Sequence, residues 1–330
     1  MPRIIATALL LFLPNLSQAA DITRIVDEHI LPGYETLVAE ADGLANAALD
    51  DCSPDNETLK AAYHSAFDAW ISVSHLRFGP SEEEQRGFAL YFWPDTRGAT
   101  QQTLTKMIVE EDAIVQDAAA FPTVSVAVRG FLALEFLLYD EAMQQVGTPE
   151  YRCALLRAIA SDMARTTSQI LEGWNTGHAE LIKSAGENET YRTEQEALRQ
   201  AFTALTTGLE FTSDARLGRP LGTFDRPRPK RAEARRSDRS LRHVVISLEA
   251  TRAMAALISD GDTQLDSMFA DAVARANALD DPVFAGVANA EGRFAVVELR
   301  QDIDAIRQAV AIELGPKLGV EAGFNSLDGD

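Results

Sequence analysis

The feature that most constrains this chain is a helical periodicity that runs through nearly its whole length. Apolar side chains recur at three- and four-residue spacing, and no segment alternates Val, Ile or aromatic residues with polar ones. The first pattern is typical of amphipathic helices and the second of half-buried strands, so the sequence predicts an all-α protein. The candidate helices are 21–49, 56–78, 96–119, 123–139, 149–183, 190–210, 238–258, 262–279 and 285–314.

These helices are too many for one simple bundle, so we expect two bundle-like halves. Turn-forming segments without helical periodicity lie near Gly147 and between Gly218 and Asp238. The first predicts a boundary between an N-terminal helical bundle, residues 20–147, and a C-terminal helical bundle, residues 148–330. The second falls inside the C-terminal half as an arginine-rich loop, residues 216–242.

The charge of the chain is uneven. Fifty acidic and thirty basic side chains give a net charge of −20, so a polyanion such as nucleic acid would be repelled. Residues 216–242 nevertheless hold ten Arg or Lys and three Asp or Glu, a local charge of +7 that leaves −27 for the remainder. This loop is interpreted either as a patch for an anion or a partner, or as a solvated linker whose arginines pair with the acidic bulk of the same protein.

The N-terminus is typical of an export signal. Arg3 supplies a positive charge, residues 4–13 form an apolar stretch, and Ser17 to Ala19 provide small residues before a cleavage point. We expect cleavage after residue 19, which leaves no transmembrane segment in the mature chain; a buried first helix is the alternative. The protein is therefore predicted to be exported, and in a Gram-negative bacterium it would be periplasmic.

Cysteine usage agrees with this compartment. Cys52 and Cys153 are the two cysteines of the chain, and two cysteines in an oxidising space usually pair. We predict a disulfide between them, with two separate buried thiols as the alternative.

A single carboxylate stands out in the candidate helix 123–139. Its charged residues are Arg129 and Glu135, and the positions one turn from Glu135 are all apolar or aromatic. Its carboxylate is therefore predicted to be buried, where an unpartnered charge costs several kcal/mol. Glu135 needs a metal, a base, hydrogen bonds or a proton of its own. A functional site and a structural ion pair with Arg77 or Arg129 are both open.

Two segments near this helix place aromatic and charged residues at turns of the chain. Phe78, Tyr91 and Trp93 could form the wall of a pocket, with Arg77 and Asp95 at its edge. In the alternative interpretation Asp95 caps the next helix and Trp93 is a packing anchor.

The histidines offer few metal-binding patterns. His64, Asp68 and His75 share one helical face, which could carry ligands or simply be solvated. His29 lies near a helix kink or boundary created by Pro32 and is a second candidate ligand.

Other catalytic patterns are missing from the sequence. His178 and His243 lie in polar surroundings and are predicted to be surface residues. There is no His-Glu-x-x-His helix, no Gly-x-Ser-x-Gly elbow and no phosphate-binding or dinucleotide fingerprint, which disfavours standard hydrolases and nucleotide enzymes.

Several segments in order resemble the imelysin-like proteins, a family of exported helical proteins that includes iron-regulated members and is also catalogued as a metallopeptidase family. They are HILPGYETL from residue 29, RFGP from 77, FWPD from 92, RGFLALEFLLY from 129, RLGRPLG from 216, AEARRSDRS from 232 and GFNSLDGD from 323. The resemblance implies two helical bundle-like halves with a site near their junction.

One position departs from the family. Its signature is Gly-x-His-x-x-Glu, in which histidine and glutamate can hold a metal; here Gly130 and Glu135 match, and Leu132 replaces the histidine. Leucine has no lone pair to donate, so metal binding in the family manner loses a ligand. As a hypothesis, His75 or His29 supplies the missing imidazole from a neighbouring helix, so that the candidate metal ligands are Glu135, His75 and His29.

The resemblance and the residues together give one leading function and two alternatives. The first is an exported, non-catalytic binding protein associated with iron or haem acquisition, with a pocket formed by Glu135, Arg77, Trp93, Asp95, Gly130 and Leu132. The pocket would bind a small ligand or a metal, either iron or another divalent ion, and binding without any metal is also open. The partner would be a membrane or surface protein of an iron-uptake system. The alternatives are a metal-dependent peptidase of the imelysin type, doubtful without the histidine, and a scaffold that docks a partner through its arginine-rich loop.

Overall fold

The computed structural model describes residues 21–319, and within them every regular element is a helix. The all-α prediction is therefore confirmed, and the one pairing of extended backbone in this range is an isolated bridge between Thr223 and Arg226. The predicted signal peptide, residues 1–19, and the segment from residue 323 lie outside the described residues. Within the described range, each helix is too short or too polar to span a bilayer.

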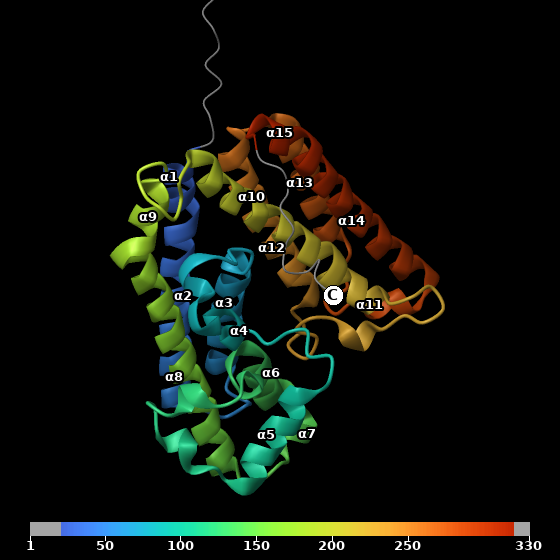
Figure 1. The fold of residues 1–330 in the computed structure, drawn as a ribbon. Coiled ribbons are helices and arrows are strands. Elements are labelled where there is room, and N and C mark those ends of the chain that lie inside the picture. Colours follow the sequence, from blue (N-terminus) through green and yellow to red (C-terminus); the bar gives the residue numbers. More distant parts are fainter. Residues whose placement is uncertain (1–20, 320–330) are drawn as a thin grey trace, which may run out of the picture.

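The first bundle is built on α2, α3 and α8. Helix α2 packs along both α3 and α8, and α6 lies against α8 (Figure 1). Its helices are α1 (Ile22–Ile25), α2 (Leu31–Asp50), α3 (Glu57–Val73), α4 (Arg86–Leu90), α5 (Ala99–Glu110), α6 (Gly130–Tyr139), α7 (Glu141–Gln144), α8 (Pro149–Gly173) and α9 (Ala179–Lys183).

The second bundle is built on α12, which packs against α10 and α13, while α13 packs against α14 (Figure 1). Helix α12 also contacts α3, so the two bundles share an interface. The helices of this half are α10 (Glu194–Glu210), α11 (Gly218–Leu221), α12 (Ser240–Ser259), α13 (Thr263–Ala278), α14 (Ala290–Ala309) and α15 (Gly315–Lys317).

Short helical segments complete both halves. Wider π turns join successive α-helices at Val26–Ile30, Trp174–His178, Phe211–Leu217 and Val310–Leu314. Single 3₁₀ turns lie at Gly79–Ser81, Glu83–Gln85, Ala113–Gln116, Phe121–Thr123, Val126–Val128, Pro229–Arg231 and Ala285–Ala288. Because the π turns continue the helical path, the long predicted helices 21–49 and 149–183 each correspond to two consecutive α-helices. The predicted helix 285–314 corresponds to a 3₁₀ turn, α14 and a π turn.

The boundary between the halves differs from the expected one. Gly147 does form a turn, with φ +59, but it only separates α7 from α8. Helix α8 then packs against α2 and α6 of the first bundle. The N-terminal bundle therefore continues past residue 147, because α8 buries its apolar face against helices that precede the turn.

A disulfide links the end of α2 to the start of α8 in the first bundle. Cys52, just after α2, is bonded to Cys153 in the first turns of α8, with 5.4 Å between the Cα atoms and 101 residues between them in sequence. The predicted pairing is confirmed. Arg157 strengthens the same junction by donating hydrogen bonds to the carbonyl oxygens of Ala48 and Leu49 at the end of α2.

Helix α6 starts later than its hydrophobic pattern predicts. It begins at Gly130, whose φ is +69, after a 3₁₀ turn at Val126–Val128. A Cβ atom at this position would lie 2.0 Å from the carbonyl oxygen of Leu90, at the end of α4. The glycine is thus required both by its backbone conformation and by the close approach of α4.

We predict that Gly130→Ala lowers the free energy of unfolding by about 2–3 kcal/mol or more, because it combines a strained φ with a backbone clash. Urea denaturation followed by circular dichroism measures the change. Gly43→Ala is the matched control: Gly43 is exposed in α2 with nothing within 4 Å of its added Cβ. It should stabilise the helix by up to about 1 kcal/mol, and equal effects of the two variants would contradict the prediction.

Candidate functional site

Glu135 lies in the most deeply buried helix of the first bundle. Every residue of α6 before Tyr139 is buried, and Glu135 itself is 1% exposed, as its apolar neighbours predict. Its Oε1 accepts hydrogen bonds from the N–H of Arg236 at 3.0 Å, the N–H of Ser237 at 3.1 Å and the hydroxyl of Ser237 at 3.0 Å. Burial raises the pKa of Glu135, while Arg236 and Ser237 oppose the rise.

The partner of Glu135 is not the one expected from sequence. Arg77 lies at the surface and forms a bidentate pair with Glu82, 2.6 Å from Nε to Oε1. Arg129 instead pairs with the buried Asp162 of α8 at 2.7 Å. The donors to Glu135 come from the other half of the chain, about one hundred residues away, and no local pattern in the sequence indicates them.

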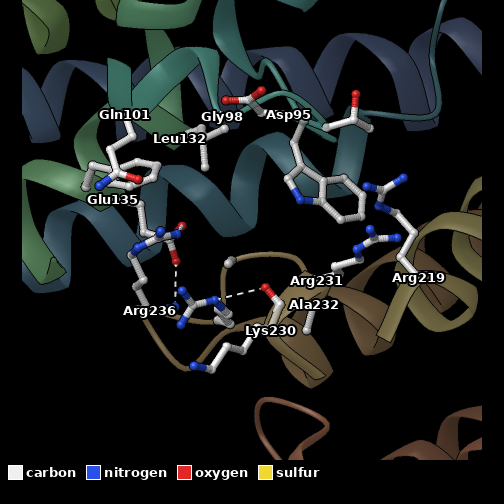
Figure 2. A pocket seen from close by; sticks show the side chains of 15 residues that line it. Asp95, Gly98, Gln101, Leu132, Glu135, Arg219, Lys230, Arg231, Ala232 and Arg236 are labelled. Atoms are coloured by element: carbon white, nitrogen blue, oxygen red, sulfur yellow. Dashed lines mark hydrogen bonds and ion pairs between the residues drawn. The ribbon is translucent and has the colours of Figure 1, made fainter. Parts of the chain in front are cut away.

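A pocket of about 310 Å³ opens beside Glu135 at the junction of the two halves (Figure 2). The first half supplies Trp93, Asp95, Thr96, Gly98, Gln101, Leu132, Glu135 and Phe136, and the arginine-rich segment supplies Arg219, Lys230, Arg231, Ala232, Ala234, Arg235 and Arg236. Of the expected pocket residues, Trp93, Asp95, Leu132 and Glu135 line it. Arg77 and Gly130 are not among the lining residues.

Asp95 has a structural role in addition to its place in the pocket wall. Its carboxylate accepts hydrogen bonds from the N–H groups of Arg97 at 3.2 Å, Ala99 at 3.0 Å and Thr100 at 2.8 Å. These donors include the first turn of α5, and they hold the pKa of Asp95 below its usual range against the effect of burial. The interpretation of Asp95 as a cap of the next helix is thus supported.

The candidate metal ligands are not assembled around one point. His29 and His75 do meet, with their Nε2 atoms 3.0 Å apart, but they contact each other and not Glu135. Within residues 21–319, no group of three or more His, Cys, Asp or Glu side chains could hold a metal ion. The expected combination of Glu135 with His75 and His29 is therefore corrected: the two histidines contact each other, and Oε1 of Glu135 accepts from the backbone of Arg236 and from the backbone and hydroxyl of Ser237.

His64 and Asp68 are also engaged elsewhere. His64 Nε2 lies 2.8 Å from the hydroxyl of Tyr139, and Asp68 forms ion pairs with Arg239 and with Arg242, the latter at 3.3 Å.

The histidine pair predicts a pH dependence. Burial lowers the pKa of His29 from 6.5 to about 4 and that of His75 well below its usual value. The unfolded chain therefore binds protons that the folded chain does not, and stability should be lost as the pH falls from about 6.5 to about 4. Between these values His29→Gln should reduce the slope of unfolding free energy against pH by up to about 1.4 kcal/mol per pH unit. Urea denaturation at stepped pH measures it, and an unchanged slope would contradict it.

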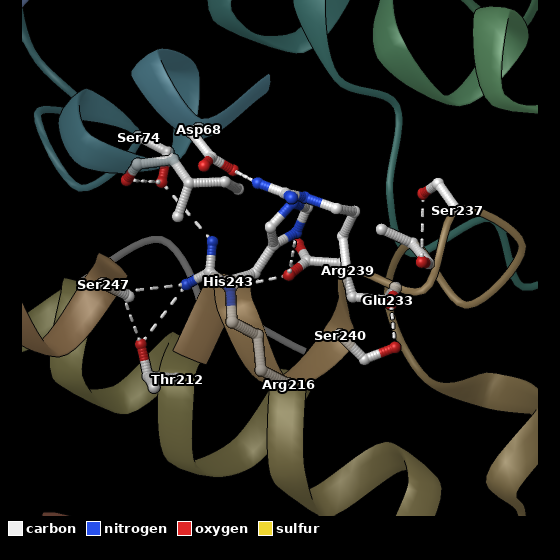
Figure 3. Close-up of polar contacts among 12 residues, drawn as sticks. Asp68, Ser74, Thr212, Arg216, Glu233, Ser237, Arg239, Ser240, His243 and Ser247 are labelled. Atoms are coloured by element: carbon white, nitrogen blue, oxygen red, sulfur yellow. Dashed lines mark hydrogen bonds and ion pairs between the residues drawn. The ribbon is translucent and has the colours of Figure 1, made fainter. Parts of the chain in front are cut away.

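A second buried charge cluster lies where α12 meets α3 (Figure 3). Arg216 donates to Glu233 at 2.8 Å, and His243 Nδ1 lies 3.1 Å from the same carboxylate oxygen. The guanidinium of Arg216 also contacts the hydroxyls of Ser247 at 3.1 Å and of Ser74, at the end of α3, at 3.4 Å. The cluster thus joins both halves of the molecule.

The placement of His243 corrects a prediction. It was expected at the surface, but its exposed fraction is 0%. The signal was present in the next residues, Val244, Val245 and Ile246, which continue α12 as an apolar run. Burial lowers the pKa of His243 despite the nearby carboxylate, whereas Arg216 and His243 hold the pKa of Glu233 below its usual range, although burial alone would raise it.

We predict that Glu233→Gln lowers the free energy of unfolding by about 3–5 kcal/mol, because it leaves the buried charge of Arg216 without a counter-charge. Chemical denaturation at pH 7 measures this loss. Glu35→Gln, on an exposed face of α2, is the control and should change stability by less than about 0.5 kcal/mol. A similarly small effect of Glu233→Gln would show that Arg216 does not depend on this carboxylate.

The arginine-rich segment supports both of its interpretations, residue by residue. Arg216, Arg236, Arg239 and Arg242 form ion pairs with Glu233, Asp140 and Asp68. For the other six cations, no carboxylate partner is found among residues 21–319: Arg219, Arg226, Arg228, Lys230, Arg231 and Arg235. Part of the segment is thus an internal ionic linker, and part is a free cationic surface.

Comparisons with known proteins identify the family. The family model described as imelysin, peptidase M75, matches residues 30–310, which is most of the chain. The chain belongs to the imelysin family. The resemblance seen in the sequence motifs is thereby confirmed.

Solved structures show the same fold. An imelysin-like protein from Psychrobacter arcticum is 19% identical, with a TM-score of 0.75 over 92% of this chain and 96% of that one. A protein from Parabacteroides distasonis, assigned as an iron-regulated protein A precursor, is 17% identical, with a TM-score of 0.68 over 88% of this chain and 92% of that one. At these identities the likeness shows a common fold and not a common ligand. No curated protein matches the sequence.

Proposed function

We propose that this imelysin-family protein is an exported, non-catalytic binding protein of iron or haem acquisition, which holds its ligand in the pocket beside Glu135. The single observation that carries the proposal is this pocket of about 310 Å³ at the junction of the halves. Concave sites between packed units are common ligand sites, and this volume is at the small end of their range. Membership of a family with iron-regulated members supports the iron association, as does the assignment of the Parabacteroides protein.

The proposed location is the periplasm, or the exterior in a cell without one. The Cys52–Cys153 disulfide and the absence of a membrane-spanning helix within residues 21–319 support it, together with the predicted signal at residues 1–19. We further propose that a membrane or surface protein of an iron-uptake system receives the ligand.

A metal held directly by the pocket fits its residues poorly. Leu132, which stands where the family motif has histidine, offers no lone pair. Glu135 Oε1 already accepts three hydrogen bonds, and Asp95 is occupied by backbone N–H groups. A catalytic zinc needs three protein ligands and an open position, and the described part of the chain assembles no such set here.

A metal-dependent peptidase is the second candidate, favoured by the name of the family model. Against it, Asp95 and Oε1 of Glu135 are occupied by hydrogen bonds, and Oε2 of Glu135 lies 4.0 Å from the Arg236 guanidinium, which stabilises the ionised carboxylate and makes it a weaker base. Incubation with peptides and added zinc distinguishes the two. Zinc-dependent cleavage that is lost in Glu135→Gln would establish the peptidase.

The binding function predicts that closing the pocket stops iron delivery. Gln101 lines the pocket from an exposed position on α5, so Gln101→Trp should cover the opening without disturbing the core. Uptake of radioactive iron by iron-limited cells carrying this variant should fall to the level of cells without the protein. Gln102→Trp is the control, because the neighbouring Gln102 is exposed and does not line this pocket. Normal uptake with folded, exported Gln101→Trp would overturn the proposal.

A further inference from the structure

The pocket beside Glu135 carries more positive charge than the protein neutralises. Five cationic and two acidic side chains line it. Arg236 pairs with Asp140 at 2.8 Å, whereas for the other four, Arg219, Lys230, Arg231 and Arg235, the described residues provide no ion pair. In a chain with fifty acidic side chains, this is a local reversal of the overall charge.

The two pocket carboxylates do not compensate for these cations. Glu135 directs Oε1 to three donors around Arg236 and Ser237, and Asp95 accepts from the start of α5. Asp95 and Oε1 of Glu135 are therefore occupied within the fold, and Oε2 of Glu135 lies 4.0 Å from the guanidinium of Arg236, which already pairs with Asp140. The cationic residues without an ion pair line the same pocket, and Figure 2 shows Arg219 and Arg231 on the Trp93 side of it.

Arg219 shows most directly that the pocket lacks acceptors for its cationic groups. Its Nε is buried and has no hydrogen-bond acceptor within the described structure. Its guanidinium lies 5.7 Å from the ring centroid of Trp93, which holds it in the pocket wall. Burial, and then the nearby charge of Arg231, lower the pKa of Arg219, as expected of cations held close together without a counter-ion. A buried donor without an acceptor is costly, and an anion from outside would supply one.

We propose that this pocket binds a small organic anion with two or three carboxylate groups, and that iron reaches it as an anionic complex with such a carboxylate. The second part rests on the proposed function in iron acquisition. A bare metal cation would meet an excess of positive charge and no free ligand.

The chemistry of the wall favours a carboxylate with a carbon skeleton. Guanidinium groups match carboxylates and phosphates with two parallel hydrogen bonds, so the cationic side of the pocket suits either oxyanion. The same pocket also presents Trp93 and Leu132, which can pack against carbon atoms but give nothing to an inorganic ion. A volume of about 310 Å³ is at the small end of the range of ligand pockets, so a small di- or tricarboxylate suits it.

Calorimetric titration of the full mature protein with citrate, ferric citrate, inorganic phosphate and zinc tests the proposal. We expect one citrate per chain, with an affinity that weakens as salt is raised, because the attraction is electrostatic. Arg231→Gln and Arg235→Gln should each weaken citrate binding about 10-fold or more. Arg226→Gln is the matched control: Arg226 is exposed in the same segment, has no ion pair within residues 21–319 and does not line the pocket.

The outcomes separate the anion site from the iron function. Citrate binding that is lost in Arg231→Gln and kept in Arg226→Gln supports the site. Phosphate binding as tight as citrate binding would overturn the assignment to an organic anion. No citrate or ferric citrate binding, while Gln101→Trp still blocks iron uptake, would overturn this inference and leave the proposed function standing. Citrate binding without ferric citrate binding would keep the anion site and overturn the delivery of iron through it.

Discussion

A carboxylate buried in an apolar helix has to be given hydrogen-bond donors, and in this protein that requirement fixes the junction between the two halves. Glu135 lies in α6, which offers it only apolar neighbours. Its donors come from the backbone and side chain at Arg236 and Ser237, in the segment that precedes α12. Because the donors include main-chain N–H groups, the path of this segment is fixed as well as its composition. The arginine side chains on either side are thereby directed toward the pocket.

The junction has an unusually polar interior for a helical protein. Besides Glu135, the Arg216–Glu233–His243 cluster is buried there and reaches Ser74 at the end of α3. Buried charges add little net stability compared with well-packed apolar groups, but they tolerate only one arrangement of partners. We interpret the two clusters as the element that specifies how α3, α6 and α12 meet. The pocket inherits its shape from that arrangement.

The sequence predicts the helices, the disulfide and the burial of Glu135, because each depends on local periodicity or on a simple count of cysteines. It does not predict the partners of buried charges. Arg77 lies in the same half of the chain as Glu135 and was the expected partner, but it pairs with Glu82. The groups that contact Glu135 belong to residues 216–242, and helical periodicity does not describe the path of that segment. The prediction that His243 lies at the surface was wrong for a related reason. It relied on the polar residues before His243 and neglected the apolar run that follows it. The sequence predicts the pocket residues that lie where aromatic side chains mark a turn, as at Trp93. It does not predict that arginines about one hundred residues later in the chain line the same pocket.

The disulfide loop contains one of the two sets of residues that line the pocket. The covalent loop from Cys52 to Cys153 encloses Trp93, Asp95, Leu132 and Glu135, whereas every cationic lining residue lies outside it. The wall that contains Glu135 thus lies in a loop closed by a bond that reductants can break, whereas the arginine-rich wall is positioned by the hydrogen bonds of Arg236 and Ser237 to Glu135 and by the ion pair of Arg236 with Asp140. Reduction of the disulfide would therefore open the covalent loop on one side of the cavity and leave the covalent structure of the arginine-rich segment unchanged.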